Sequence, residues 1–189
     1  MVELSLELSD REIVDRLNML TGGKCAVRVI TRRGRGAFGE KPQARIAFGC
    51  RKIVEDLARY GIGPRKSLTA VFAGGIETNR HAWRGVIDGD GSIFHRVLRP
   101  GGVPHPFISL VGSLALLEQF ATYVAALSPG YSGTPRPAGK NKPHYHIVTS
   151  GRHAQRLAAN LYEGATIALT RKAIRAAEVM KWVCRSGRT

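Results

Sequence analysis

The segment HAWRGVIDGDGSIF, residues 81–94, carries the pattern that decides the fold. Ala82, Gly85 and Gly89 are spaced three and four residues apart, so a helix brings them onto one face. Residues this small allow the backbone of a second helix to come close. The segment therefore predicts a helix, beginning near Thr78, whose small-residue face receives another helix.

Two acidic residues, Asp88 and Asp90, lie where this helix is expected to end, on either side of Gly89. A glycine at such a position can break a helix. The last helical carbonyl groups carry partial negative charge and lack partners, so carboxylates beside them are unfavourable unless a cation is bound. Oxygen ligands suit hard cations, which predicts a magnesium or calcium site at the helix end.

Three simpler interpretations of the segment compete with a metal site. An EF-hand loop fails, because aligning the two aspartates with its third and fifth positions puts Val86 and Val97 where acidic residues are required. The dipeptide Asp-Gly is also common in plain turns between a helix and a strand. Finally, Gly85 is consistent with tight packing that involves no second helix of this kind.

The composition indicates a folded, strongly basic protein. A chain of 189 residues with 43% hydrophobic residues can bury a core. Its 29 Lys and Arg against 14 Asp and Glu give a formal charge of +15 and an isoelectric point near 10.6. This surplus predicts a polyanionic partner, most commonly nucleic acid. On charge alone, a basic enzyme of small substrates and a ribosome-associated protein remain alternatives.

Cysteines, histidines and hydropathy exclude several other classes. Cys25, Cys50 and Cys184 are far apart and odd in number, which favours reduced thiols in a cytoplasmic protein over a disulfide framework. His144 and His146 would share one face of a strand, either as a zinc pair or, more simply, as a polar face. No apolar run approaches the ~20 residues of a membrane helix, and the acidic N-terminus does not resemble a signal peptide.

The expected element order suggests an internal repeat. Residues 78–182 predict helix, strand, strand, helix, strand, strand, helix, helix, and residues 2–60 predict strand, helix, strand, strand, helix. The shorter order matches the longer one without its opening helix and one strand. We expect residues 1–70 to be an incomplete first repeat and residues 76–189 a complete second repeat.

The segment WRGVIDGDG resembles the LAGLIDADG motif of homing endonucleases, with Trp83 and Arg84 in place of the usual leucine and alanine. LYEGATIALTRK resembles the family's closing-helix pattern, an aromatic residue followed by Leu169, Arg171 and Lys172, and LARYGIGPRKS resembles the end of another repeat. The resemblance covers nearly the whole chain. It implies an α+β fold of αββαββα repeats, in which an antiparallel β-saddle lies along DNA with helices behind it.

The resemblance also implies a sequence-specific endonuclease that hydrolyses phosphodiesters of double-stranded DNA with Mg²⁺. Two motif helices pack together and deliver one acid each to two active sites. By residue match, Asp90 is the catalytic, metal-binding acid, the Gly89 carbonyl a second ligand, and Asp88 an orienting or capping residue. Lys66 is the candidate for a lysine that stabilises developing charge, beside the alternative of a plain surface lysine.

Basic residues on the expected hairpins and loops would form the DNA-binding surface, by binding phosphates or by contacting guanine edges in the major groove. Arg96 and Arg99 are three residues apart, so a regular strand would direct only one of them at DNA. Each candidate is equally consistent with a solvated charge. The candidates are Arg28, Arg32, Arg45, Arg96, Arg99, Arg136, Lys140 and Lys142.

Only one motif helix is found, whereas a single-chain member of the family needs two. The chain is therefore expected to be a fragment that lacks an N-terminal segment, a homodimer joined through Ala82, Gly85 and Gly89, or a degenerate copy that binds DNA without cutting. A DNA-binding regulator and an intron RNA maturase of the same fold stay open. The acid at Asp90 favours the nuclease over the regulator. The resemblance implies a role in intron or intein mobility, with a free-standing origin left open.

Overall fold

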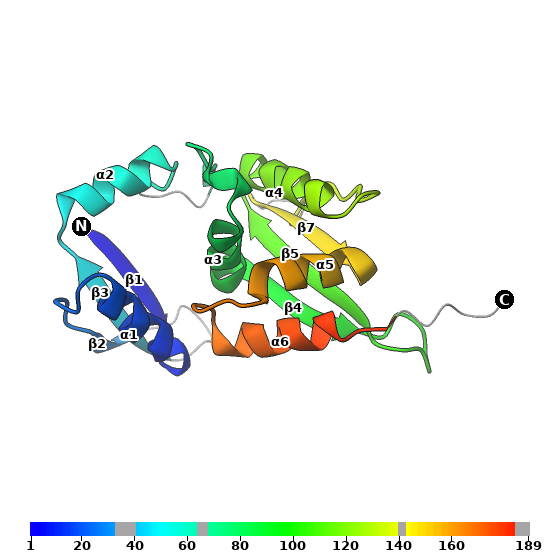
Figure 1. The fold of residues 1–189 in the computed structure, drawn as a ribbon, viewed down its shortest axis with the longest axis horizontal. Coiled ribbons are helices and arrows are strands. Elements are labelled where there is room, and N and C mark those ends of the chain that lie inside the picture. Colours follow the sequence, from blue (N-terminus) through cyan, green and yellow to red (C-terminus); the bar gives the residue numbers. More distant parts are fainter. Residues whose placement is uncertain (33–40, 64–67, 140–142, 184–189) are drawn as a thin grey trace. The chain divides into compact units, whose positions relative to one another are not determined.

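The computed structural model describes residues 1–32, 41–63, 68–139 and 143–183. Its contacts divide the chain into two compact units, Met1–Ala58 and Arg59–Thr189 (Figure 1). Each unit is built on an antiparallel sheet and has its own hydrophobic core. The order of helices and strands in both segments confirms the predicted α+β class and the predicted element order.

The first unit is a three-stranded sheet in the order β1-β3-β2, against which helix α1 packs. Its elements are β1 (Val2–Glu7), the 3-10 helix η1 (Leu8–Asp10), α1 (Arg11–Leu20), β2 (Arg28–Arg32), β3 (Lys41–Phe48) and α2 (Arg51–Arg59). Alternation along β3 buries Ala44 and Ile46 against Val14 of α1.

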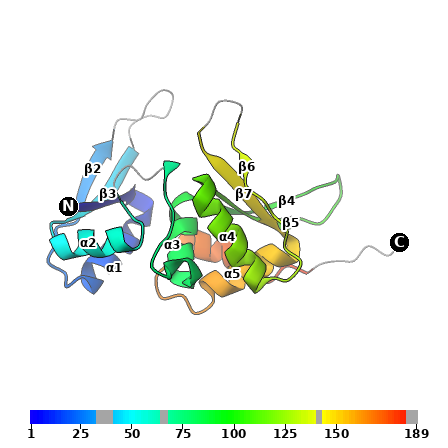
Figure 2. The same cartoon turned by 90° about the horizontal axis from the view of Figure 1, so that it is seen from above.

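The second unit is a four-stranded sheet in the order β4-β5-β7-β6. Its elements are η3 (Ile76–Thr78), α3 (Arg80–Asp90), β4 (Gly91–Arg96), β5 (His105–Gly112), α4 (Leu114–Leu127), β6 (Arg136–Pro137), β7 (Tyr145–Ser150), α5 (Gly151–Tyr162) and α6 (Thr170–Met180). Figure 2 shows these helices on one face of the sheet. We call the opposite face, which no described element of this unit covers, the outer face.

The core of the second unit is built around the fully buried Trp83. Its ring lies edge-on to Phe72, with ring centroids 4.8 Å apart, and tilted against Phe120, with ring centroids 5.2 Å apart. Its Nε1 donates a hydrogen bond to the Glu77 carbonyl oxygen at 2.6 Å. Residues 59–76 belong to this unit, because Phe72 is part of its core. The interpretation of the two units as repeats of one motif stays a prediction.

Strand register determines the composition of the outer face. β4 and β5 pair Phe94 with Phe107, and β5 and β7 pair Val111 with His146. Buried residues such as Ile108 alternate with these positions and point to the helices. The outer face carries Ser92, Phe94, Arg96, Phe107, Ser109, Val111, Arg136, His146, Val148 and Ser150.

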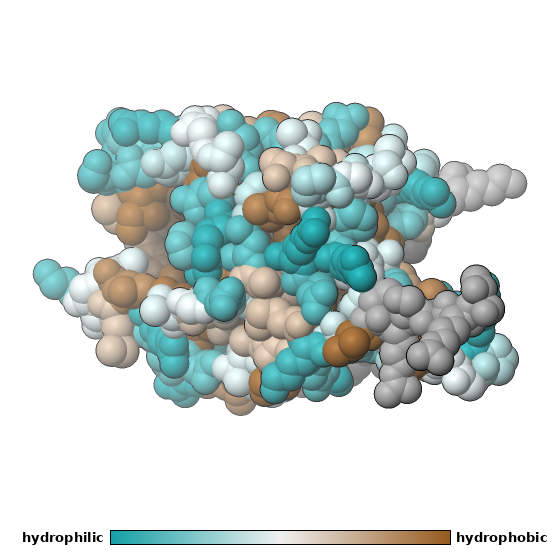
Figure 3. All heavy atoms as spheres, turned by 45° about the vertical axis from the view of Figure 1, so that its right-hand side comes forward, coloured by the Kyte–Doolittle hydropathy of each residue, from teal (hydrophilic) through white to brown (hydrophobic). Residues whose placement is uncertain are grey.

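Figure 3 shows the hydropathy of one face of the molecule. On the face drawn in Figure 3, hydrophilic side chains predominate and hydrophobic ones lie among them in small patches. Among the described helices, none is long and apolar enough to cross a membrane.

Candidate functional site

Helix α3 presents the motif residues on two opposite faces. It begins at Asn79, whose side chain accepts a hydrogen bond from the His81 backbone N–H at 2.8 Å, a regular N-cap. The buried face consists of Trp83, Arg84 and Ile87. The exposed positions are His81, Gly85, Gly89 and Asp90.

Both departures from the LAGLIDADG pattern have structural explanations. Trp83 fills the core, and the buried Arg84 guanidinium ties α3 to the end of α5 and the segment before α6. Its Nε donates to the Ile167 carbonyl at 2.7 Å and its Nη1 to the Leu161 carbonyl at 3.0 Å. Burial lowers the pKa of Arg84, and the negative charge of Asp88 acts in the opposite direction.

The carboxyl end of α3 is closed by the buried Lys172 of α6. Its Nζ donates to the carbonyls of Ile87 at 2.5 Å, Asp88 at 2.6 Å and Gly91 at 2.9 Å. The ammonium group therefore compensates the partial negative charge of the helix end. The sequence predicted a cation at the end of this helix, and the Lys172 ammonium group occupies that position. The expectation of a metal ion therefore depends on Asp90 alone.

The glycine that ends α3 is Gly91, and the prediction that Gly89 breaks the helix is wrong. Helix α3 continues through Gly89 to Asp90, because Lys172 satisfies carbonyls of its last turn. A Cβ on Gly91 would lie 2.8 Å from the Ile87 carbonyl oxygen and 2.9 Å from the Ile87 Cα. Only glycine fits where the chain passes directly from α3 into β4.

Asp88 holds α3 against α5 and the start of α6. Its Oδ1 accepts a hydrogen bond from the Tyr162 hydroxyl at 2.7 Å, and its Oδ2 accepts one from the Leu169 backbone N–H at 3.0 Å. Burial raises the pKa of Asp88, while both hydrogen bonds and the charge of Lys172 lower it. Burial and the neighbouring carboxylate also raise the pKa of Tyr162. Both carboxylate oxygens are thus engaged within the unit, which suits an orienting role.

The raised pKa of Asp88 predicts a pH dependence of stability that an Asp88→Asn variant lacks. The folded state holds the Asp88 proton to a higher pH than the unfolded chain, where the pKa is about 3.9. The stabilising contribution is therefore full below that value and is lost as pH rises through the folded pKa. Urea unfolding between about pH 3 and pH 7 should show the parent losing stability relative to the variant. Parallel curves would contradict this prediction.

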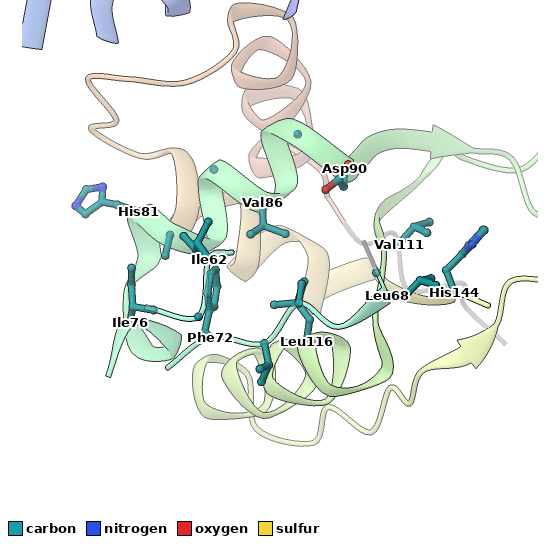
Figure 4. Close-up of a pocket in the computed structure, with 17 residues that line it drawn as sticks. Ile62, Leu68, Phe72, Ile76, His81, Val86, Asp90, Val111, Leu116 and His144 are labelled. Carbon is teal, nitrogen blue, oxygen red and sulfur yellow. The ribbon is translucent and has the colours of Figure 1, made fainter. Parts of the chain in front are cut away.

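Asp90, in contrast, is exposed at the last position of α3, next to the exposed Gly89. It lines one end of a groove of about 660 Å³, with His144 nearby, and His81 lines the other end (Figure 4). The walls between them come mainly from residues 61–62 and 68–76, α3, β5 and α4, and most of their side chains are apolar. The acidic residue of the motif therefore stands at the mouth of an apolar groove.

The small-residue face of α3 is open toward this groove. Ala82, Gly85 and Gly89 line it, and a Cβ on either glycine would meet no described atom of its unit within 4 Å. Tight packing among the described residues of the unit therefore does not account for these glycines. The face has room for the close approach of another backbone.

The described basic residues of the second unit that were expected to bind DNA do not all lie on the sheet. Arg96 is on the outer face at the end of β4, whereas Arg99 is exposed beyond that strand. Arg136 of β6 pairs across from His146 on the outer face. The uncovered sheet face thus carries basic side chains at two of its edges.

In the first unit, Arg28 of β2 and Arg45 of β3 are cross-strand partners on the sheet face opposite α1. Arg45 forms an ion pair with Glu3, and Lys41 forms one with Glu7 at 3.4 Å. This face therefore mixes both signs of charge. Among the remaining candidates, only the backbone of Arg32 is described, and those outside the described residues are Lys66, Lys140 and Lys142.

The inference from sequence missed the buried polar network of Arg84, Tyr162 and Lys172. One signal was present: Arg84 adjoins a core tryptophan on an otherwise apolar helix face, and a buried charge requires partners. Tyr162 and Lys172 lie in the segment that resembles the closing-helix pattern. Nothing in their spacing showed that they reach the carboxyl end of α3.

A scan of family models and a search of curated proteins found no match to this sequence. Among solved structures, 19 chains match. They include the crystal structure of the LAGLIDADG homing endonuclease I-GzeII in complex with a DNA target. That match covers 95% of this chain and 78% of the other, with a TM-score of 0.61 and 8% identity. The fold is that of a LAGLIDADG homing endonuclease. At this identity, the likeness establishes the LAGLIDADG fold and nothing about activity.

Within the LAGLIDADG fold, the end of α3 offers a partial set of metal ligands. The Asp90 carboxylate and the Gly89 carbonyl are oxygen donors of the kind that Mg²⁺ prefers. The described residues contain no group of three or more His, Cys, Asp or Glu that would hold a metal ion by themselves. Magnesium usually keeps several waters and binds through one or two carboxylates plus substrate phosphates, so the two donors fit such an ion once DNA is present.

Proposed function

We propose that this protein is a metal-dependent endonuclease that cuts double-stranded DNA at a specific sequence, as a homing enzyme does. The observation that carries the proposal is the contrast between the two aspartates of α3. Asp88 is engaged by Tyr162 and Leu169, whereas Asp90 is exposed at the helix end. A carboxylate exposed at the end of the motif helix is an oxygen ligand of the kind that binds Mg²⁺.

The residues around Asp90 suit phosphodiester hydrolysis. Bound Mg²⁺ supplies activation of a water molecule and stabilisation of the departing 3′ oxygen. In this chain the Asp90 carboxylate and the Gly89 carbonyl would hold the ion, and Lys172 fixes the helix end that carries them. Such fixing preorganises the site before DNA binds. Lys66 remains the candidate for stabilising the charge that develops on the phosphate.

The positive charge supports duplex DNA as the substrate. Phosphates attract a chain of charge +15, and I-GzeII, which shares the fold, is described in complex with a DNA target. We assign DNA binding to the sheet faces that the helices of each unit leave uncovered. The residues proposed to contact DNA are Arg28, Arg32, Arg45, Arg96, Arg99, Arg136, Lys140 and Lys142.

A second motif helix would complete the site. The open face of Ala82, Gly85 and Gly89 is the place for it, and the apolar groove beside this face would be covered at the same time. A second copy of the chain would supply this helix by two-fold symmetry, together with a second Asp90. A motif helix from a further segment of a longer chain would fill the same face.

Replacing Gly85 by Gln should separate the stability of the unit from its association. The glycine lies in the exposed middle of α3 with free space around it, so a better helix former should stabilise the monomer by about 0.5 kcal/mol. The longer side chain should prevent close approach of a second helix and shift the protein toward monomer. Thermal unfolding measures the change in stability, and sedimentation of the same sample measures the oligomeric state.

The matched control is Ala125→Gln on the exposed face of α4, away from the groove. It should leave the oligomeric state unchanged. If Gly85→Gln associates as the parent does, a second copy of the chain does not bind through the α3 face.

Two other functions of the same fold, a DNA-binding regulator and an RNA maturase, are distinguished by whether the protein prefers duplex DNA or intron RNA. A regulator would bind duplex DNA without needing Asp90 as a metal ligand, and a maturase would prefer structured intron RNA. Binding to a randomised duplex library and to folded intron RNA should be measured in Ca²⁺, followed by Mg²⁺ to allow cutting. Preference for duplex and cutting in Mg²⁺ support the nuclease. Binding without cutting indicates the regulator, and preference for RNA indicates the maturase.

A further inference from the structure

Two phenylalanines form a stacked pair on the outer face of the second sheet. Phe94 of β4 and Phe107 of β5 are direct cross-strand partners, with ring centroids 5.4 Å apart and ring planes 17° from parallel. Phe94 is 38% exposed. No described element of this unit covers the pair, although an uncovered aromatic pair in contact with water forgoes the stabilisation of burial.

Polar and basic residues lie beside the pair on the same strands. Arg96 follows Phe94 on the same face of β4, and Ser92 precedes it, opposite Ser109 of β5. Residues two apart on a strand are about 6.8 Å apart, which is close to two base-pair steps of about 3.4 Å in duplex DNA. Arg96 and the aromatic pair are thus spaced to contact different base pairs of one duplex.

The positive charge favours nucleic acid over a protein as the partner of this apolar pair. Arg96 and Arg136 lie on the same outer face, and the whole chain carries +15. The mutual stacking of the rings favours a duplex over a single strand. Each ring covers one side of the other, and the His105 ring lies against Phe107 with centroids 5.4 Å apart, so less ring face is free for stacking on an unpaired base than two separate rings would offer.

A duplex presents one apolar group in the major groove, the C5-methyl of thymine, and aromatic side chains contact this methyl. We propose that Phe94 and Phe107 form a thymine-recognition site, which contacts one or two thymine methyl groups of the target while Arg96 contacts a neighbouring base pair or phosphate. This inference rests on the proposed binding of duplex DNA and adds a base preference to it.

The test uses a chemical change in the DNA that leaves the protein intact. Duplexes bound by the parent are selected from a randomised library, and each thymine of the selected site is replaced in turn by deoxyuridine, which lacks only the methyl group. At the thymine that contacts the pair, the affinity should fall about three- to fivefold per methyl. A Phe94→Ser variant should bind the thymine and deoxyuridine duplexes equally.

The matched control is Ile174→Ser, which removes an exposed apolar side chain from α6, on the helical side of the sheet. It should keep the full sensitivity to deoxyuridine. If no position is sensitive, or if Phe94→Ser keeps the parent's sensitivity, thymine recognition by this pair is wrong while duplex binding stands. Failure to select any duplex overturns the proposed function and this inference together. Phe94-dependent binding of single strands in place of duplex overturns the inference.

Discussion

Replacing Asp90 by Asn is expected to lower the rate of DNA cleavage strongly and to leave folding intact. The side chain is exposed, and no other described residue supplies a free carboxylate to the end of α3, because both oxygens of Asp88 are engaged. Loss of a group that stabilises charge in the transition state commonly lowers the rate by about 10²- to 10³-fold. Cleavage of a bound duplex in Mg²⁺ measures this loss, and thermal unfolding checks the fold.

The control for Asp90→Asn is Glu118→Gln, which neutralises an exposed carboxylate on α4. Both variants raise the net charge by one, so general electrostatic attraction to DNA changes equally. An Asp90→Asn variant that cuts as fast as Glu118→Gln would overturn the assignment of Asp90 as the metal-binding acid.

Replacing Lys172 by Met is expected to cause the largest loss of stability. The methionine fills much of the same space but donates no hydrogen bond, so three carbonyls lose the ammonium group at a buried helix end. Unsatisfied buried polar groups cost about 1–3 kcal/mol each, and removing one side of a buried charge network costs about 3–5 kcal/mol. We expect the free energy of unfolding of the second unit to fall by at least about 3 kcal/mol.

Urea unfolding followed by circular dichroism measures the effect, with Lys181→Met as the control. Lys181 stands at the end of the same helix and is exposed. Its replacement should change stability by about 0.5 kcal/mol or less. Equal losses in the two variants would show that Lys172 does not hold the end of α3.

The positions of the helices and strands could be predicted from local patterns in the sequence. The spacing of Ala82, Gly85 and Gly89 predicted that they share one face of a helix, and all three line the groove beside α3. These features depend on neighbours in the sequence or on helix and strand periodicity. For the same reason, the exposure of Asp90 agrees with its expected position at the end of the motif helix.

The tertiary contacts of the site could not be predicted in this way. Lys172 reaches carbonyls more than 80 residues earlier in the chain, and Arg84 reaches Leu161 and Ile167. Their partners depend on how α5 and α6 pack, which local periodicity does not encode. The prediction of a helix break at Gly89 was wrong for the same reason, since the stabilising ammonium group comes from a distant helix.

The most direct test of the proposed function is cleavage of the uninterrupted form of the DNA that flanks the gene of this protein. The rebuilt duplex is incubated with the purified chain in Mg²⁺, and in EDTA as the control, while light scattering records the mass in solution. We expect Mg²⁺-dependent cutting of both strands at one position, by an assembly that carries two motif helices. Tight binding of the duplex without cutting, by a monomer, would contradict the nuclease and leave a DNA-binding protein with a LAGLIDADG fold.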